Sequence, residues 1–154
     1  MFAWMPFLAA DFGCMFGGFL VMKLQKRGVN LINARCYAFT LGACLMTGMA
    51  FVGYVDSPYA AIALLSVGGF AHQTLSVTVI TMSSDLFKRS EVATVAGMAG
   101  TCGNAGLLIF NLMIGSLVVA IGYTPFFIGL AALDLVGAAA LWLLVREKKT
   151  VAVN

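Results

Sequence analysis

The stretch KLQKRGVNLINAR, residues 23–35, separates two apolar segments and contains four of the nine Lys and Arg residues in the chain. The other five lie in two further polar breaks, at 88–89 and 146–149. Two intervening breaks, near 56–58 and 122–125, contain no cation. Short loops rich in Lys and Arg stay on the cytoplasmic side of a membrane, so the basic breaks are expected inside and the bare ones outside. The sequence therefore predicts five crossings that start outside and end inside.

Apolar residues dominate the composition: 62% of the chain is hydrophobic and only 10% is charged, which excludes an ordinary soluble domain. A helix needs roughly 20 apolar residues to cross the hydrocarbon core. Unbroken apolar runs favour helices over the alternating strands of a barrel. The expected fold is an all-α integral membrane protein. Its predicted spans are about 4–22, 36–55, 60–82, 92–121 and 125–145, followed by a short cytoplasmic tail at 146–154.

The start of the chain does not explain how its first span would reach the outside. No cationic flank precedes the apolar segment that begins near Trp4, and the signal-peptide order of charged, apolar and small-residue regions is missing. We therefore expect upstream helices to deliver this segment. On that interpretation the sequence is the carboxy-terminal piece of a larger transporter or channel.

The sequence offers no support for an enzyme or a nucleic-acid-binding protein. The four cysteines lie in or beside apolar segments without the close pairing typical of metal sites. No phosphate-cradling loop and no Ser/His/Asp set occurs in an aqueous segment. The net charge of +3 reflects the cytoplasmic loops rather than a nucleic-acid surface. We therefore predict a non-enzymatic membrane protein without metal or organic cofactor.

Two patterns run along the fourth apolar segment. Glycine recurs at every third residue from Gly97 to Gly106, which predicts close approach of a neighbouring helix, as do the glycines at 13, 17 and 18. Polar residues recur at alternating steps of three and four, which places them on one face that must meet a helix or a water-filled cavity. That face contains Thr94, Gly97, Thr101, Asn104, Leu108 and Asn111. Contact with another helix and contact with substrate are equal alternatives for its amides.

The third segment gathers three polar side chains within one turn. His72 and Ser76 are four residues apart, and Gln73 and Ser76 are three apart. Gln73 has the same two alternatives as the amides of the fourth segment. His72 is the one histidine of the chain, and a structural role and a proton-handling or ligand-binding role are both open.

Two carboxylates lie well inside predicted spans. Asp11 is seven residues past Trp4, and Asp134 is nine past Pro125. An ionised Asp at the bilayer centre costs about 2.5 to 3.5 kcal/mol, so each must be protonated, paired or next to water. Proton coupling is one hypothesis. We favour a helix-locking role for both, more strongly for Asp134, and retain Asp11 as a coupling candidate.

Several of these stretches resemble the major facilitator superfamily. The break from Gly17 to Gly28 is similar to that superfamily's loop motif, although the usual acidic position holds Met22 or Lys23. The stretches GGFAHQ at 68–73, SSDLF at 83–87 and EVAT at 91–94 resemble the tenth and eleventh helices of anion:cation symporters, most closely bacterial hexuronate transporters. WMPFLAADFGC at 4–14 and ALDLVGA at 132–138 are similar to the same family.

The resemblance implies that this chain corresponds to helices eight to twelve of a twelve-helix transporter in the bacterial inner (cytoplasmic) membrane. It implies proton-coupled import of galacturonate or glucuronate by rocking of two halves around a central site, with sodium as the alternative coupling ion. The missing amino-terminal helices would be partners of this part, as would the lipid bilayer. Another organic anion, such as an aldonate or a dicarboxylate, is an alternative substrate, and a truncated protein inactive on its own is a third hypothesis.

A uronate needs a cation for its carboxylate and amides or hydroxyls for its ring. No Lys or Arg occurs inside the predicted spans, so we expect the carboxylate anchor in the absent half. From the side chains that share a helix face, we predict that four amide and hydroxyl side chains contact the sugar hydroxyls. These side chains are Gln73, Ser76, Thr101 and Asn104. His72, Asp11 and Asn111 are the candidates for lining the cavity or coupling.

Overall fold

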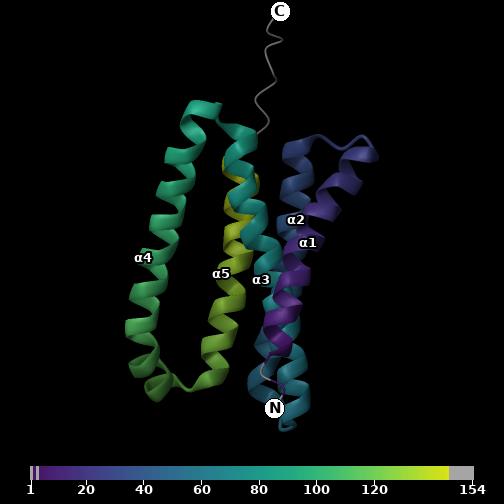
Figure 1. Ribbon diagram of the computed structural model, residues 1–154. Coiled ribbons are helices and arrows are strands. Elements are labelled where there is room, and N and C mark those ends of the chain that lie inside the picture. Colours follow the sequence, from purple (N-terminus) through teal and green to yellow (C-terminus); the bar gives the residue numbers. More distant parts are fainter. Residues whose placement is uncertain (1, 3, 146–154) are drawn as a thin grey trace, which may run out of the picture.

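The computed structural model describes Phe2 and residues 4–145, which form five long α-helices and one 3₁₀ helix (Figure 1). The elements are α1 (Met5–Lys26), α2 (Leu31–Met46), η1 (Thr47–Tyr54), α3 (Pro58–Leu86), α4 (Arg89–Ile121) and α5 (Tyr123–Leu144). With α2 and η1 taken together, five segments are long and apolar enough to cross a membrane. The predicted all-α fold with five such helices is confirmed. The tail at 146–154, with its three cations, lies outside the described residues.

Successive helices run in opposite directions, so their connections alternate between the two ends of the bundle (Figure 1). The turns between α1 and α2 and between α3 and α4 lie at one end. These are the turns that contain the basic residues of 23–35 and 88–89. The breaks without cations, at 55–57 and Gly122, lie at the other end. The charge pattern and the fold therefore agree on which connections share an end.

Local sequence signals account for the connections. Gly28 adopts a positive φ of 85° after α1, and the Asn30 side chain then accepts a hydrogen bond of 3.0 Å from the backbone N–H of Ile32. This is an N-cap, which satisfies a backbone donor that the first turn of α2 leaves free. Pro58 lies in the first turn of α3, where its missing N–H does no harm. Gly122, with a φ of 79°, separates α4 from α5.

The second membrane segment differs from the sequence prediction at its start, and its last part is a 3₁₀ helix rather than an α-helix. The helix begins at Leu31 rather than near Cys36, because the cap at Asn30 starts it earlier. Arg35 therefore belongs to α2 and not to the polar turn. Beyond Met46 the segment continues as the 3₁₀ helix η1, which is longer than the short pieces in which this conformation usually occurs.

Helices α1 and α3 pack closely through glycine. A Cβ atom at Gly13 would overlap the backbone of Phe70, and one at Gly17 would lie 2.8 Å from the Val77 side chain. The Thr74 hydroxyl lies 3.0 Å from the Gly13 carbonyl oxygen and is completely buried. Gly13 and Gly17 thus have the packing role that the sequence predicted, since small residues let membrane helices approach. The prediction is wrong for Gly18, where a Cβ would meet no atom within 4 Å.

Helix α5 packs against α2 and η1. The Trp142 indole N–H donates to the Thr40 hydroxyl at 2.9 Å, and the Tyr37 and Trp142 rings lie 5.3 Å apart between centroids. At the opposite end the Thr124 hydroxyl donates to the Gly53 carbonyl at 3.3 Å. Phe39, Leu75 and Ala138 form a buried cluster that joins α2, α3 and α5.

Helix α4 stands apart from the remaining bundle (Figure 1). None of its residues whose burial is described is buried. A Cβ added at Gly97, Gly100, Gly103 or Gly106 would meet no atom within 4 Å. The close approach predicted for this glycine series is therefore not made by any helix of the described residues, and the space beside α4 is open.

Candidate functional site

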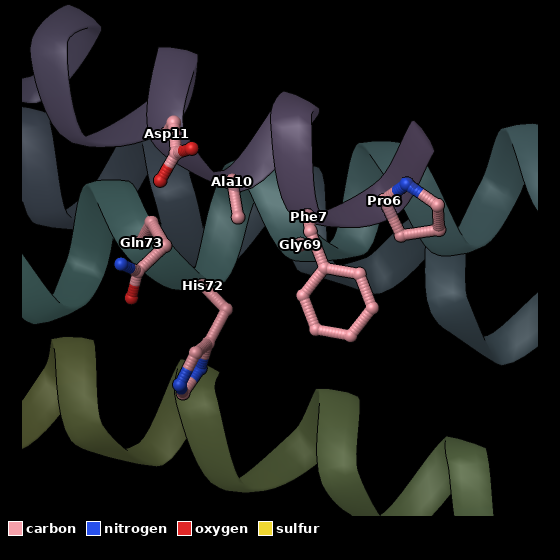
Figure 2. Close-up of a pocket in the computed structure, with 7 residues that line it drawn as sticks. All are labelled: Pro6, Phe7, Ala10, Asp11, Gly69, His72 and Gln73. Atoms are coloured by element: carbon pink, nitrogen blue, oxygen red, sulfur yellow. The ribbon is translucent and has the colours of Figure 1, made fainter. Parts of the chain in front are cut away.

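Two cavities lie on different sides of α3, and His72 lines both of them. The first has a volume of about 550 Å³ and lies between α1 and α3 (Figure 2). Its polar lining consists of Asp11 from α1 and His72 and Gln73 from α3. Close approach of the two helices shapes this wall, because a Cβ at Gly69 would lie only 2.8 Å from the Pro6 carbonyl oxygen.

The second cavity, of about 800 Å³, occupies the space between α3, α4 and α5. Apolar side chains form most of its wall, and Gly100, Gly103 and Gly106 open it along α4. The polar groups that line it come from all three helices. They are His72, Ser76, Ser83, Asn104 and Asp134. An apolar cavity with a few convergent polar groups is the usual form of a small-molecule site in a membrane bundle.

The His72 imidazole is directed toward α5 and away from Asp11, as Figure 2 shows. Asp134 of α5 lines the same cavity as His72. Asp11 and Gln73 line the cavity between α1 and α3 and not the one that contains Asp134. His72 thus shares one cavity with Asp11 and the other with Asp134.

The structure brings together some of the predicted site residues and separates others. Ser76, Asn104 and His72 line the cavity beside α4. Gln73 and Asp11 line the cavity beside α1 instead. Thr101 and Asn111 line neither cavity, and both are exposed on α4. The substrate contacts themselves stay a prediction.

Two side chains of the polar face of α4 hydrogen-bond to their own helix. The Thr101 hydroxyl donates to the Gly97 carbonyl at 2.9 Å, and the Asn104 amide donates to the Gly100 carbonyl at 2.9 Å. Bonding within α4 satisfies only part of the Asn104 amide. Its amide N–H has a partner within α4, while its carbonyl oxygen is left to accept a hydrogen bond from the cavity.

Sequence reasoning favoured a helix-locking role for Asp134 and did not name it as a site residue, and the structure places it on the wall of the cavity that His72 also lines. The number of ionisable residues within the spans could have identified Asp134 as a site residue. Asp11, His72 and Asp134 are the only Asp, Glu, His, Lys or Arg residues within the five predicted spans. Ionisable residues at membrane depth cluster at functional cavities. Among the described residues, no Lys or Arg lines either cavity.

Comparison with known proteins finds close relatives among sugar-acid transporters. The chain is 47% identical over 154 residues to a hexuronate transporter of Escherichia coli K12, a match that covers 99% of the chain. It is 55% identical over 64 residues, or 41% of the chain, to a galacturonate transporter of Dickeya chrysanthemi. A D-galactonate transporter of Escherichia coli O6:H1 is 27% identical over 95% of the chain.

The matches cover only part of each relative. The chain spans 36% of the hexuronate transporter, 19% of the galacturonate transporter and 34% of the galactonate transporter. No family model matches the chain. The resemblance to hexuronate transporters drawn from the sequence motifs is confirmed by these relatives.

Proposed function

We propose that this chain is the carboxy-terminal part of a hexuronate transporter, with α1 to α5 as helices eight to twelve of a major facilitator superfamily fold. The observation that carries the proposal is the 47% identity over 154 residues to the hexuronate transporter of Escherichia coli K12. Five helices long and apolar enough to span a membrane support it. The whole protein would reside in the bacterial inner membrane, with Met5 near the outer side and Leu144 near the cytoplasm.

The transported substrate is galacturonate or glucuronate, carried together with a proton by alternating access. Ser76 and Asn104 bind sugar hydroxyls in the cavity between α3, α4 and α5, because both line it. Gln73 contributes from the cavity beside α1. The substrate carboxylate is held by a cation of the half that these 154 residues do not include. Thr101 and Asn111 line neither cavity and contact a helix of that half.

Transport assays on the whole protein test this function. We expect the complete transporter in proteoliposomes to accumulate radiolabelled galacturonate when the outside is made acidic, and not when a proton ionophore is present. Replacing the proton gradient by a sodium gradient separates the two coupling ions. Absence of uronate uptake under either gradient, from protein that is correctly inserted, would refute the proposal.

A second candidate substrate class is the aldonates, which the 27% identity to the D-galactonate transporter supports. Competition distinguishes the classes. Unlabelled glucuronate should reduce galacturonate uptake, whereas equal concentrations of galactonate or of a dicarboxylate should reduce it much less. Stronger competition by galactonate would reassign the substrate. We expect the 154-residue chain in vesicles on its own to accumulate no uronate, because it lacks the cation that the substrate needs.

Membrane orientation has its own test. A cysteine at Asp56, which is exposed in the connection between η1 and α3, should react with an impermeant thiol reagent added to intact cells. A cysteine at Lys88, in the connection between α3 and α4, should react only after the membrane is permeabilised. The whole protein with all its native cysteines replaced, including the four of this chain, serves as the background. The reverse labelling pattern would invert the proposed topology.

A further inference from the structure

His72 shares a cavity with each of two carboxylates. It lines the cavity that contains Asp11 and also the cavity that contains Asp134. Its imidazole is directed toward α5, the helix that contains Asp134 (Figure 2). Helices α3 and α5 make no close backbone contact within the described residues, so the imidazole reaches across an open space.

The other elements around α3 bring no further titratable group to this space. Helix α4 lines the cavity with small and apolar residues and Asn104, and α2 contributes Phe39. No residue of η1 lines either cavity. Arg35 and Asp85 pair with each other at 2.8 Å, at the last turn of α3. Within residues 4–145, the groups that can exchange a proton with His72 in these cavities are therefore Asp134 and, on the far side, Asp11.

We propose that His72 and Asp134 together form a binding site for one proton, which is the coupling site of the transporter. This inference rests on the proposed transport function. With the proton bound, the pair is a carboxylic acid beside a neutral imidazole, or a carboxylate beside an imidazolium. The two forms interconvert when the O–H bond of Asp134 breaks and an N–H bond of His72 forms. Loss of the proton leaves a carboxylate and a neutral imidazole, with one net negative charge.

The charge of the pair controls the space between α3 and α5. A protonated pair is neutral overall and tolerates the removal of water, whereas an unpaired carboxylate is strongly disfavoured in a dry membrane interior. Proton binding therefore favours a state in which the cavity loses water and narrows, and proton release favours the open, hydrated state. Ser76 and Asn104 line the same cavity, so its narrowing or opening also changes how these two side chains are placed for a sugar.

Nuclear magnetic resonance of the whole transporter labelled with ¹³C and ¹⁵N in histidine tests the proton site without any transport. The signal of His72 is assigned by its loss in His72→Gln. Two groups that share a proton titrate as a pair, so we expect its chemical shift to show two inflections with pH in the wild type and one in Asp134→Asn. Asp56→Asn, in the outer connection, is the matched control and should retain both.

Two results would overturn the proposal. One is a His72 titration curve that is the same in Asp134→Asn as in the wild type. The other is loss of the second inflection in Asp11→Asn instead, which would assign the proton to the cavity beside α1. Because this measurement needs no substrate, it decides the proton site even if the transporter proves to carry no uronate.

Transport measurements then test whether the proton site couples. Asp134→Asn and His72→Gln should lose uphill accumulation of galacturonate driven by a proton gradient. Both should retain exchange of external labelled for internal unlabelled galacturonate, because exchange requires no net proton movement. Accumulation at the wild-type level in both variants would show that coupling occurs elsewhere. Absence of exchange in the wild type would instead count against the proposed substrate.

Discussion

The Nε–H group of Arg35 donates to the Oδ2 atom of Asp85 at 2.8 Å and joins the first turns of α2 to the last turn of α3. The two side chains are only 14% and 15% exposed. Water therefore cannot fully solvate either charge if its partner is removed. Within residues 4–145 this is the ion pair that the structure contains, and it fastens the cytoplasmic end of the proposed topology.

Removing one member of this pair should destabilise the bundle. Arg35→Gln or Asp85→Asn leaves a poorly solvated charge, and we expect the free energy of unfolding to fall by about 3 kcal/mol. Unfolding of the purified whole protein in mixed micelles of increasing denaturing detergent measures the change. The double variant Arg35→Gln/Asp85→Asn is the control. It should cost less than the sum of the single variants, since residues in contact couple. Additive losses would contradict a direct interaction.

The glycines of α1 provide a matched comparison. Gly13→Ala would place a methyl group into the backbone of Phe70, whereas a Cβ at Gly18 meets no atom within 4 Å. Forced overpacking costs about 1 to 3 kcal/mol, so we expect Gly13→Ala to lower the unfolding free energy by that amount or more. Gly18→Ala should be neutral or slightly stabilising. Equal effects of the two substitutions would contradict the close approach of α1 and α3.

The hydrogen bond between Trp142 and Thr40 should make a measurable contribution to the free energy of unfolding. Trp142→Phe keeps an aromatic ring near Tyr37 but removes the indole N–H that donates to the Thr40 hydroxyl at 2.9 Å. We expect a loss of about 1 kcal/mol in unfolding free energy. Thr40→Val removes the acceptor. In the double variant the second change should cost little beyond the first, and two independent losses would argue that α5 does not pack on α2 in this register.

The number of helices and the alternation of their directions could be predicted from the sequence because apolar length and loop charge are local signals. Which helices are neighbours could not. Arg35 and Asp85 are 50 residues apart along the chain, and only the cap at Asn30, which starts α2 early, brings Arg35 onto a helix that faces Asp85. The available signal was that both residues lie at the same end of their segments.

The candidate site was predicted in part for a similar reason. Helical spacing correctly placed His72, Gln73 and Ser76 on about one turn of α3. Side chains on one turn still point in different directions around the helix axis. Gln73 faces α1, whereas Ser76 faces α4 and α5. Spacing also grouped Asn104 with Asn111 on one stripe of α4, although the cavity reaches only the first of them. Cavities depend on the angles between helices, which a single sequence does not determine.

The two asparagines of α4 therefore give a sharp test of the proposed substrate contacts. Asn104 lines the cavity, and its carbonyl oxygen is available to a sugar hydroxyl after its amide bonds to Gly100. Asn104→Ala should raise the KM for galacturonate by about tenfold, the equivalent of one hydrogen bond of about 1.4 kcal/mol. Asn111→Ala makes the same chemical change on the same helix, yet Asn111 lines neither cavity, so the KM should stay unchanged. A larger effect at Asn111 than at Asn104 would move the substrate out of this cavity and toward the outer end of α4.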